Sequence, residues 1–216
     1  MNDDILTQVR KHRIIVAMRG VPPERMTAAA QAMYEGGIRM LEITFNQNDP
    51  QTADRTAAAI RAVNAAMGGC MLVGAGTVLT AAQARAAVEA GAKYLLSPNL
   101  DLEVMAEARR LGTAMIPGAM TPSEVACAWK AGAALVKLFP ADTLGLPYIK
   151  AMAAPLGHIP LLPMGGVNSR NLMEFLSHPS VAGVGVGSNI AKAPLIQAGD
   201  FDAIRGLARE FTAQLQ

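Results

Sequence analysis

The chain repeats a unit of helix, glycine and strand about every 20 residues. The segments "EAGAKYLLSP", "RLGTAMIPGA" and "KAGAALVKLF" each place a glycine between alanine-rich helical residues and an apolar run. Gly91, Gly112 and Gly132 are 21 and 20 residues apart. A fixed period of this length indicates a repeated supersecondary unit, and glycine suits the left-handed residue just past a helix end. The chain is therefore constrained to fold as successive helix–strand units.

Eight apolar strands alternate with alanine-rich helices along the 216 residues. This alternation is typical of an α/β fold, and eight such units predict a (β/α)8 TIM barrel, as a single domain over residues 1–216. An open doubly wound sheet is the alternative, but "GAGTVL" at 74–79 has Leu79 where a dinucleotide fingerprint needs its third glycine. The predicted strands are Ile14–Met18, Met40–Thr44, Met71–Ala75, Tyr94–Ser97, Ala114–Pro117, Leu135–Phe139, Pro160–Met164 and Val181–Val186.

Capping residues predict where several helices begin. Thr80, Thr121 and Asn168 stand where N-caps belong, and Pro122 suits a first helical position. A further helical segment is expected at about residues 1–12, before the first strand.

Charge and hydropathy narrow the possible partners. The net charge is +2, and no basic run carries interleaved aromatic residues, which argues against a nucleic-acid partner. No apolar run reaches the roughly 18 residues that indicate a membrane span. The start "MNDDILTQVRKHR" is too charged for a secretory signal. We therefore expect a cytoplasmic protein with no membrane partner.

Cysteine and histidine usage predicts neither a disulfide nor a metal site. Cys70 and Cys127 have alanine-rich, apolar surroundings and are expected to be reduced residues of the core. His12, His158 and His178 are far apart in sequence and lack metal-ligand spacing. We expect no catalytic metal and no other bound cofactor.

A lysine stands in the middle of an otherwise apolar strand. Seven of the eight residues of "ALVKLFPA", residues 134–141, are apolar, and the exception is Lys137. An unpaired ammonium in an apolar interior costs more than the usual stability of a domain, unless it is paired or loses its proton. Of the six lysines, Lys137 alone lies centrally in a predicted strand.

Polar side chains converge on Lys137 if the predicted barrel forms. Every second residue of a barrel strand points inward, and active sites form at the carboxyl ends of the strands. Glu42 and Thr44 share one face of the second strand. Ala17 and Arg19 share one face of the first. Thr77 follows the third strand and is expected at the rim.

Two interpretations of Lys137 and Glu42 stay open from the residues alone. One is a buried ion pair, which often adds no net stability relative to an apolar replacement. The other is catalysis. Burial lowers the pKa of a lysine, so that its neutral amine can attack a ketone and form an imine. A partly desolvated glutamate is suited to carry protons. The catalytic interpretation also explains why both charges stand at the active end.

Two glycine-containing stretches indicate a phosphate site. "PMGGVNSRNL" places Gly165 and Gly166 after the seventh strand, at the opening of a helix, and "GVGVGSNI" places Gly187 and Ser188 after the eighth. Barrels often bind phosphate through backbone N–H groups of the loops that follow these two strands. The alternative is that these glycines only form tight turns.

Several motifs, taken in order, resemble those of one family. "LEITF", "GAGTV", "SPNLD", "PGAMTPSE", "VKLFPA" and "GGV" are together similar to the class I 2-keto-3-deoxy-6-phosphogluconate (KDPG) aldolases. That family includes 2-keto-3-deoxy-6-phosphogalactonate and 4-hydroxy-2-oxoglutarate (KHG) aldolases. The resemblance covers about residues 10–215. It implies a (β/α)8 barrel, usually a homotrimer, that works without a metal.

The resemblance implies roles for individual residues. Lys137 in "VKLFPA" matches the Schiff-base lysine, and Glu42 in "LEITF" matches the general acid/base. Thr77 in "GAGTV" matches a residue that holds the pyruvate carboxylate. Phe139 matches a residue that packs on the methyl side of pyruvate, and Pro98 in "SPNLD" is expected to contact substrate.

The remaining matches concern the charged ends of the substrate. Gly165, Gly166 and Ser188 match the phosphate cradle, and Arg19 matches a basic position of the first strand. The gluconate-type enzymes commonly have "EVTLRT", whereas this chain has "EITFNQ". Asn46 therefore stands where an arginine would help to hold the carboxylate, and the preferred sugar epimer is left open.

The implied reaction is a retro-aldol cleavage of a 2-keto-3-deoxy sugar acid phosphate. Lys137 condenses with C2 of KDPG, and pyruvate and glyceraldehyde 3-phosphate are the products. The galactonate epimer, or 4-hydroxy-2-oxoglutarate with glyoxylate as product, are alternative substrates. A phosphate-binding barrel isomerase or synthase is a competing class, but it has no need of a lysine within the sixth strand. A non-catalytic sugar-phosphate sensor is another.

Overall fold

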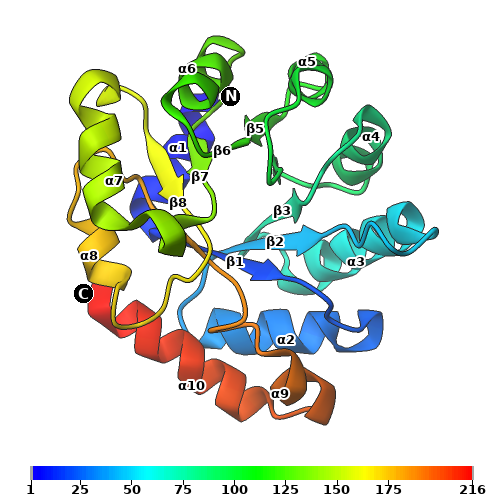
Figure 1. Cartoon of the computed structure of the whole chain (residues 1–216). Helices are drawn as coiled ribbons and strands as arrows, with labels where there is room; N and C mark the ends of the chain where they lie inside the picture. Colours follow the sequence, from blue (N-terminus) through cyan, green and yellow to red (C-terminus); the bar gives the residue numbers. More distant parts are fainter. Residues whose placement is uncertain (1, 216) are drawn as a thin grey trace.

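Helices form a ring around a central group of parallel strands (Figure 1). The computed structural model describes residues 2–215. The strands are β1 (Ile14–Met18), β2 (Met40–Thr44), β3 (Leu72–Gly76), β4 (Tyr94–Leu96), β5 (Ala114–Ile116), β6 (Gly118–Ala119), β7 (Val136–Leu138), β8 (Leu161–Pro163) and β9 (Val184–Val186). The helices are α1 (Asn2–His12), α2 (Pro23–Glu35), α3 (Thr52–Met67), α4 (Ala81–Glu89), α5 (Leu102–Arg110), α6 (Pro122–Lys130), α7 (Ala141–Leu156), α8 (Leu172–Leu176), α9 (Ala193–Ala198), α10 (Phe201–Thr212) and the 3₁₀ turn η1 (Ala213–Leu215).

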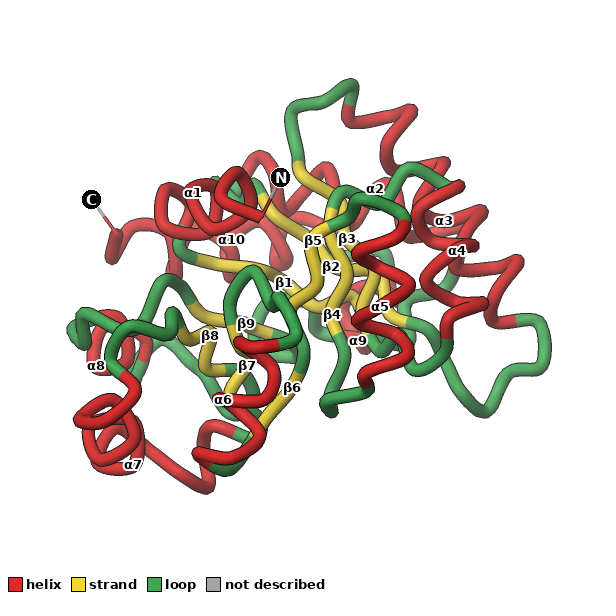
Figure 2. The backbone as a smooth tube through the Cα atoms, turned by 90° about the horizontal axis from the view of Figure 1, so that it is seen from above, coloured by secondary structure: helices red, strands yellow, loops and turns green. Residues whose placement is uncertain are grey.

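Two hydrogen-bonded sheets make up the barrel wall, and Figure 2 shows both groups of strands. One sheet has the order β5–β4–β3–β2–β1–β9, and the other has the order β6–β7–β8. Parallel bridges from Leu161 to Val181 and from Met164 to Gly185 join β8 to β9. Strands β5 and β6 are halves of one barrel strand, separated at Pro117, which has no N–H group to donate. The nine short strands within residues 2–215 therefore correspond to the eight of the predicted (β/α)8 barrel, and the predicted fold class is confirmed.

The inside of the barrel is a small apolar core closed at one end by α1. Met40 of β2, Tyr94 of β4 and Leu135, just before β7, pack into one buried cluster. Ile5 and Val9 of α1 join the same cluster. Since this cluster contains Met40, Tyr94 and Ala114, the first residues of β2, β4 and β5, α1 covers the amino ends of the strands. The carboxyl ends of the strands therefore remain as the open end of the barrel.

Two of the three predicted helix caps are confirmed. The Thr80 hydroxyl accepts a hydrogen bond from the Gln83 amide at 3.1 Å. Thr121 and Glu124 form a reciprocal capping box before α6, whose first residue is Pro122, as predicted. Between residues 2 and 215, no helix is both long enough and apolar enough to cross a bilayer.

The prediction that Asn168 caps a helix is wrong. Helix α8 begins only at Leu172, with Asn171 at its N-cap position. The Asn168 side chain instead accepts the amide N–H groups of Arg170 and Asn171, at 3.0 and 3.3 Å. The residues after Gly166 therefore form a loop stabilised by asparagine side chains, and the helix does not open at the two glycines as predicted.

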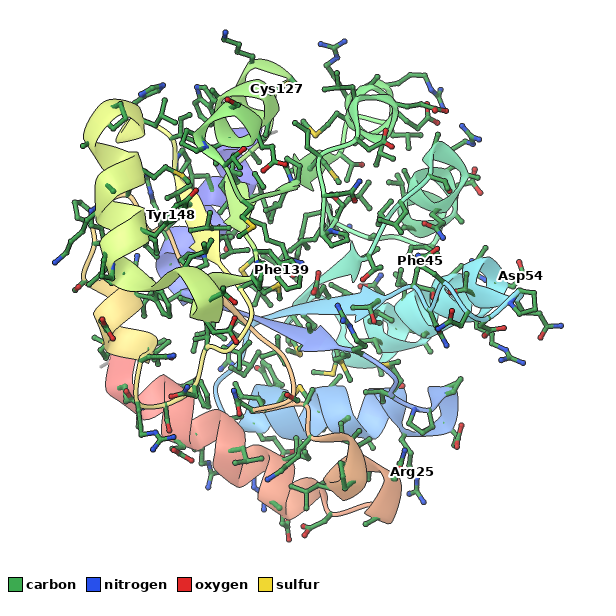
Figure 3. The ribbon with its side chains drawn as sticks, in the orientation of Figure 1. Arg25, Phe45, Asp54, Cys127, Phe139 and Tyr148 are labelled. Atoms are coloured by element: carbon green, nitrogen blue, oxygen red, sulfur yellow. The ribbon has the colours of Figure 1, made fainter. Side chains whose placement is uncertain are left out.

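The prediction that both cysteines lie in the core is also wrong. Cys70 and Cys127 are free thiols, and both are exposed. Cys127 lies on the outer face of α6, between the buried residues Val125 and Ala128, and Figure 3 shows it at the edge of the molecule. Alanine is common on both faces of these helices, so alanine-rich surroundings do not indicate burial.

The last barrel strand is shorter than predicted, because the chain changes partner within it. The amide of Ala182 donates to Leu161 on β8, whereas the amide of Val184 donates to Arg13, next to β1. Regular pairing begins only at Val184. This crossing closes the barrel between its last and first strands.

Candidate active site

Lys137 projects into the barrel interior from the middle of β7. Its side chain is 2% exposed, and its amide donates to the Pro117 carbonyl at 2.9 Å. The amine lies 4.9 Å from the centre of the Phe139 ring. Burial lowers the pKa of Lys137, the negative charge of Glu42 opposes this shift, and the positive charge of Arg19 adds to it. The amine is therefore neutral more often than that of an exposed lysine.

Glu42 faces the same interior from β2 and is 1% exposed. Its Oε2 is the one buried side-chain oxygen or nitrogen without a hydrogen-bond partner among the described residues. Burial raises the pKa of Glu42, while the positive charges of Lys137 and Arg19 lower it. A carboxyl whose charged form is disfavoured in this way is suited both to accept and to return a proton.

A cavity of about 330 Å³ joins these two groups to the open end of the barrel. Figure 3 places Phe139, one of its lining residues, near the centre of the ring of helices. Among the side chains that the structure describes, no three of histidine, cysteine, aspartate or glutamate are grouped to hold a metal ion. The cavity brings together most of the predicted site residues, namely Arg19, Glu42, Lys137, Phe139, Gly165, Gly166, Gly187 and Ser188.

The loop after β8 forms one wall of the cavity through its backbone. Gly165 and Gly166 have φ angles of 96° and 68°, which are accessible to glycine without a steric cost. A side chain at position 166 would overlap Asp142 at the start of α7. The two glycines thus let the backbone of this loop approach a ligand closely.

Asparagine side chains hold this wall in place. Asn168 and Asn171 each donate through Nδ2 to the Gly166 carbonyl, at 3.0 and 3.1 Å. Asn189 donates through Nδ2 to the Val167 carbonyl at 2.7 Å, which ties the loop after β9 to the loop after β8. Asn189 also lines the cavity. Sequence reasoning missed Asn189, although it follows the predicted phosphate-binding Ser188 directly.

Three of the predicted substrate contacts do not line this cavity. Thr44 borders a separate cavity of about 230 Å³ between the loops after β1 and β2. Pro98 borders a third cavity of about 270 Å³, which also touches Phe139. Thr77 has a φ angle of 57°, a strained value for a β-branched residue, and its carbonyl accepts a hydrogen bond from Gln47 Nε2 at 2.9 Å. Their roles stay predictions.

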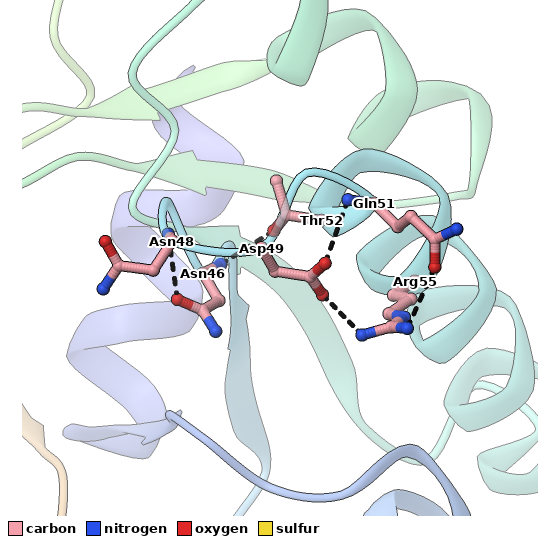
Figure 4. Close-up of polar contacts among 6 residues, drawn as sticks. All are labelled: Asn46, Asn48, Asp49, Gln51, Thr52 and Arg55. Carbon is pink, nitrogen blue, oxygen red and sulfur yellow. Dashed lines mark hydrogen bonds and ion pairs between the residues drawn. The ribbon is translucent and has the colours of Figure 1, made fainter.

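The loop after β2 contains Asn46 and is stabilised by its own polar contacts (Figure 4). The Asn46 side chain accepts the amide of Asn48 at 3.2 Å. The nearby Arg55 guanidinium pairs with Asp49 at 2.8 Å. Neither Asn46 nor Arg55 lines the cavity, so Arg19 is the guanidinium that lines it among the described residues.

A buried amine and a buried carboxyl, each shifted toward its neutral form, face one cavity at the carboxyl ends of barrel strands. Enzymes with this fold carry their catalytic residues at that end, and a desolvated lysine is suited to imine formation with a ketone. Fold and cavity together are typical of an enzyme of the (β/α)8 class. The chain belongs to the KDPG and KHG aldolase family, because the model of that family matches residues 5–207.

Relatives of known name agree with this assignment. The chain is 35% identical over 209 residues to the 2-dehydro-3-deoxy-phosphogluconate aldolase of Treponema pallidum (strain Nichols), with 95% of each chain covered. It is 34% identical over 181 residues to the 2-dehydro-3-deoxy-6-phosphogalactonate aldolase of Escherichia coli (strain K12), which covers 83% of this chain and 85% of the relative. Among solved structures it is similar to KDPG aldolase from Legionella pneumophila with pyruvate captured as a covalent carbinolamine, at a TM-score of 0.85 and 28% identity over 97% of each chain.

Proposed function

We propose that this chain is a class I aldolase that cleaves KDPG to pyruvate and glyceraldehyde 3-phosphate through an imine on Lys137. The observation that carries the proposal is the pair of buried groups, Lys137 and Glu42, that face one cavity. The carbinolamine captured in the Legionella relative supports covalent chemistry of this kind.

The reaction uses the two buried groups in sequence. The neutral amine of Lys137 attacks C2 of the substrate, and the resulting carbinolamine takes a proton from the Glu42 carboxyl and loses water to give an iminium ion. Glu42 takes the proton of the C4 hydroxyl while the electron pair of the C3–C4 bond moves to the iminium, and the aldehyde leaves. Glu42 then returns a proton to C3 of the enamine. Addition of water releases pyruvate, restores the Lys137 amine and returns the proton to the Glu42 carboxylate.

The cavity wall is suited to hold the phosphate. Gly165, Gly166, Gly187 and Ser188 line the cavity, and in this proposal their backbone N–H groups and the Ser188 hydroxyl hold the phosphate. Exposed Arg19 supplies positive charge for an acidic substrate. The further substrate contacts in this proposal are Thr44, Thr77, Pro98 and Phe139.

The same chemistry serves the galactonate epimer and 4-hydroxy-2-oxoglutarate, because the imine forms at C2 whatever the configuration of the more distant carbons. Kinetics on the two epimers side by side measure the preference. We expect the larger kcat/KM for the gluconate epimer. A larger value for the galactonate epimer or for 4-hydroxy-2-oxoglutarate would change the assigned substrate and leave the mechanism in place.

Borohydride reduction in the presence of pyruvate tests the mechanism. We expect one pyruvyl-derived group per chain, and peptide mass spectrometry should locate it on Lys137. Lys137→Arg should give no adduct and no cleavage, because a guanidinium stays protonated and cannot form the imine. Lys93→Arg is the matched control, since Lys93 is exposed next to β4. An adduct on another lysine, or none in the unmodified chain, would refute the proposal.

We also propose that the protein is a cytoplasmic homotrimer that needs no metal, as its family resemblance implies. Light scattering after gel filtration should then give three times the chain mass of 22.6 kDa. Cleavage should be unchanged after dialysis against a chelator. A monomeric mass or loss of activity on chelation would contradict these expectations.

A further inference from the structure

The Glu42 carboxylate lies directly against the backbone of Gly76 on β3. A Cβ atom at position 76 would lie 2.6 Å from Glu42 Cδ and closer still to Oε2. Gly76 is not among the glycines with a positive φ angle, so the backbone at this position is open to any residue. The requirement for glycine is therefore one of space, and the space is occupied first by the carboxylate and then, at 3.0 Å, by Thr44 Cγ2.

Tyr94 explains why the carboxylate points to Gly76. The residue of β3 that pairs with Glu42 is Gly74. The space beside Gly74 is filled by the Tyr94 ring, since a Cβ atom there would lie 2.6 Å from Tyr94 Cδ2. The Tyr94 hydroxyl donates to the Leu41 carbonyl at 2.6 Å, which anchors the ring. Because the Tyr94 ring fills the space beside Gly74, the Glu42 side chain extends toward Gly76, at the carboxyl end of β3, and toward the cavity.

Oε2 of Glu42 is positioned by the contact with Gly76 and not by a hydrogen bond from a described residue. This buried oxygen accepts no hydrogen bond from any described residue, although a buried acceptor without a partner is costly. Glu42 and Lys137 line the same cavity. An oxygen that is positioned by contacts and not by hydrogen bonds keeps its lone pairs free for proton transfer.

We propose that Gly76 is a positioning residue for the cleavage reaction. This inference rests on the proposed function, in which Glu42 moves protons to and from the intermediate on Lys137. The missing side chain at position 76 sets the direction of the carboxylate. Proton transfer needs the heavy atoms within about 2.6–3.2 Å, so a methyl group at position 76 displaces the carboxylate and impairs proton transfer more than imine formation.

The test separates these two steps with pyruvate alone. Exchange of the pyruvate methyl protons in D₂O, followed by NMR, reports proton transfer, and borohydride trapping on Lys137 reports imine formation. Gly76→Ala should retain trapping within about threefold and lose exchange by about 10²-fold, as expected for a general acid–base group. Glu42→Asp shortens the side chain and leaves room for the methyl. In that background the same alanine should cost about tenfold less, as coupled sites are not additive.

Gly74→Ala is the matched control, because it adds a methyl to the same face of the same strand. It presses on the Tyr94 ring, so it should lower the melting temperature while exchange per folded molecule falls far less than in Gly76→Ala. Equal losses of exchange in the two alanine variants, or additive losses for Gly76→Ala and Glu42→Asp, would overturn the proposal.

A Gly76→Ala variant that fails to fold still tests the proposal. If Gly76→Ala does not fold, its combination with Glu42→Asp should fold, because the clash is with the glutamate side chain. Failure of both variants would assign Gly76 to backbone packing and overturn the proposal. An unmodified chain that shows no adduct on Lys137 would refute the proposed function and this inference with it. Normal trapping and normal exchange in Gly76→Ala would refute the inference alone.

Discussion

Replacing the buried lysine and glutamate by neutral side chains of similar size should stabilise the protein and abolish its activity. The variant combines Lys137→Met with Glu42→Gln. The two side chains are 2% and 1% exposed, and burial outweighs their mutual attraction in shifting each pKa toward the neutral form. Replacing buried opposite charges by well-packed apolar residues of similar volume is often neutral or gains about 1–4 kcal/mol. At roughly 2–4 °C per kcal/mol for a chain of this size, a gain of about 2 kcal/mol raises the melting temperature by roughly 4–8 °C.

The gain in stability of the double variant should depend on pH, in a direction set by the two pKa shifts. The pKa of Glu42 is raised, so the stability cost of this group is absent below its ordinary pKa of 4.5 and appears as the pH rises through the raised value. The pKa of Lys137 is lowered, so its cost is absent above the ordinary pKa of 10.5 and appears as the pH falls through the lowered value. Below pH 4.5, Lys137→Met alone should therefore match the double variant.

The effect is measured by thermal and urea unfolding between about pH 4 and pH 10. The four proteins compared are the unmodified chain, Lys137→Met, Glu42→Gln and the double variant. Lys93→Met is a suitable control, because that lysine is exposed and its replacement should change the melting temperature little. A double variant that melts below the unmodified chain at pH 7 would refute the reasoning. It would show that the attraction between Lys137 and Glu42 exceeds the cost of burying both charges.

Three further predictions concern single residues. Glu42→Gln should still trap pyruvate on Lys137 but lower turnover by about 10²–10⁴-fold; turnover within a few-fold of the unmodified chain would assign proton transfer to another group. Ser188→Asp should raise KM for KDPG, because each charge pair at about 4 Å costs about 4 kcal/mol before screening at an effective dielectric near 20. Cleavage of unphosphorylated 4-hydroxy-2-oxoglutarate should change little, and equal losses would place the phosphate elsewhere. Thr121→Ala removes the capping box with Glu124 and should cost about 1 kcal/mol in urea unfolding; unchanged stability would show that the cap is dispensable.

The convergence of Lys137 and Glu42 could be predicted because strand periodicity is a local property. Alternation by two places these residues on the inward faces of their strands, and parallel strands in a barrel bring their carboxyl ends together. The structure places both groups on one cavity. The same alternation predicted that Arg19, just after β1, faces the site together with Ala17, and both residues line the cavity.

Local patterns failed where the outcome depends on distant segments. Cys127 was predicted to be buried because alanines flank it in sequence, but it lies on the exposed face of α6, and packing against the barrel buries Val125 and Ala128 instead. Asn189 was missed because its partner, the Val167 carbonyl, is 22 positions away in sequence. No spacing rule connects an asparagine after one strand with a carbonyl after another.

The sequence by itself determined the alternation of strands and helices, the identity of the family, and the two titratable residues at the carboxyl ends of the strands. These follow from residue type and spacing, which the chain carries whether or not it is folded. Only the tertiary structure decided the direction of each pKa shift and the placement of the Glu42 carboxylate on Gly76. The pKa shifts depend on desolvation. The placement of the carboxylate depends on the Tyr94 ring, which comes from a different strand, 52 positions after Glu42 in the chain. Burial and close contact arise when distant segments pack together, and no local pattern encodes them.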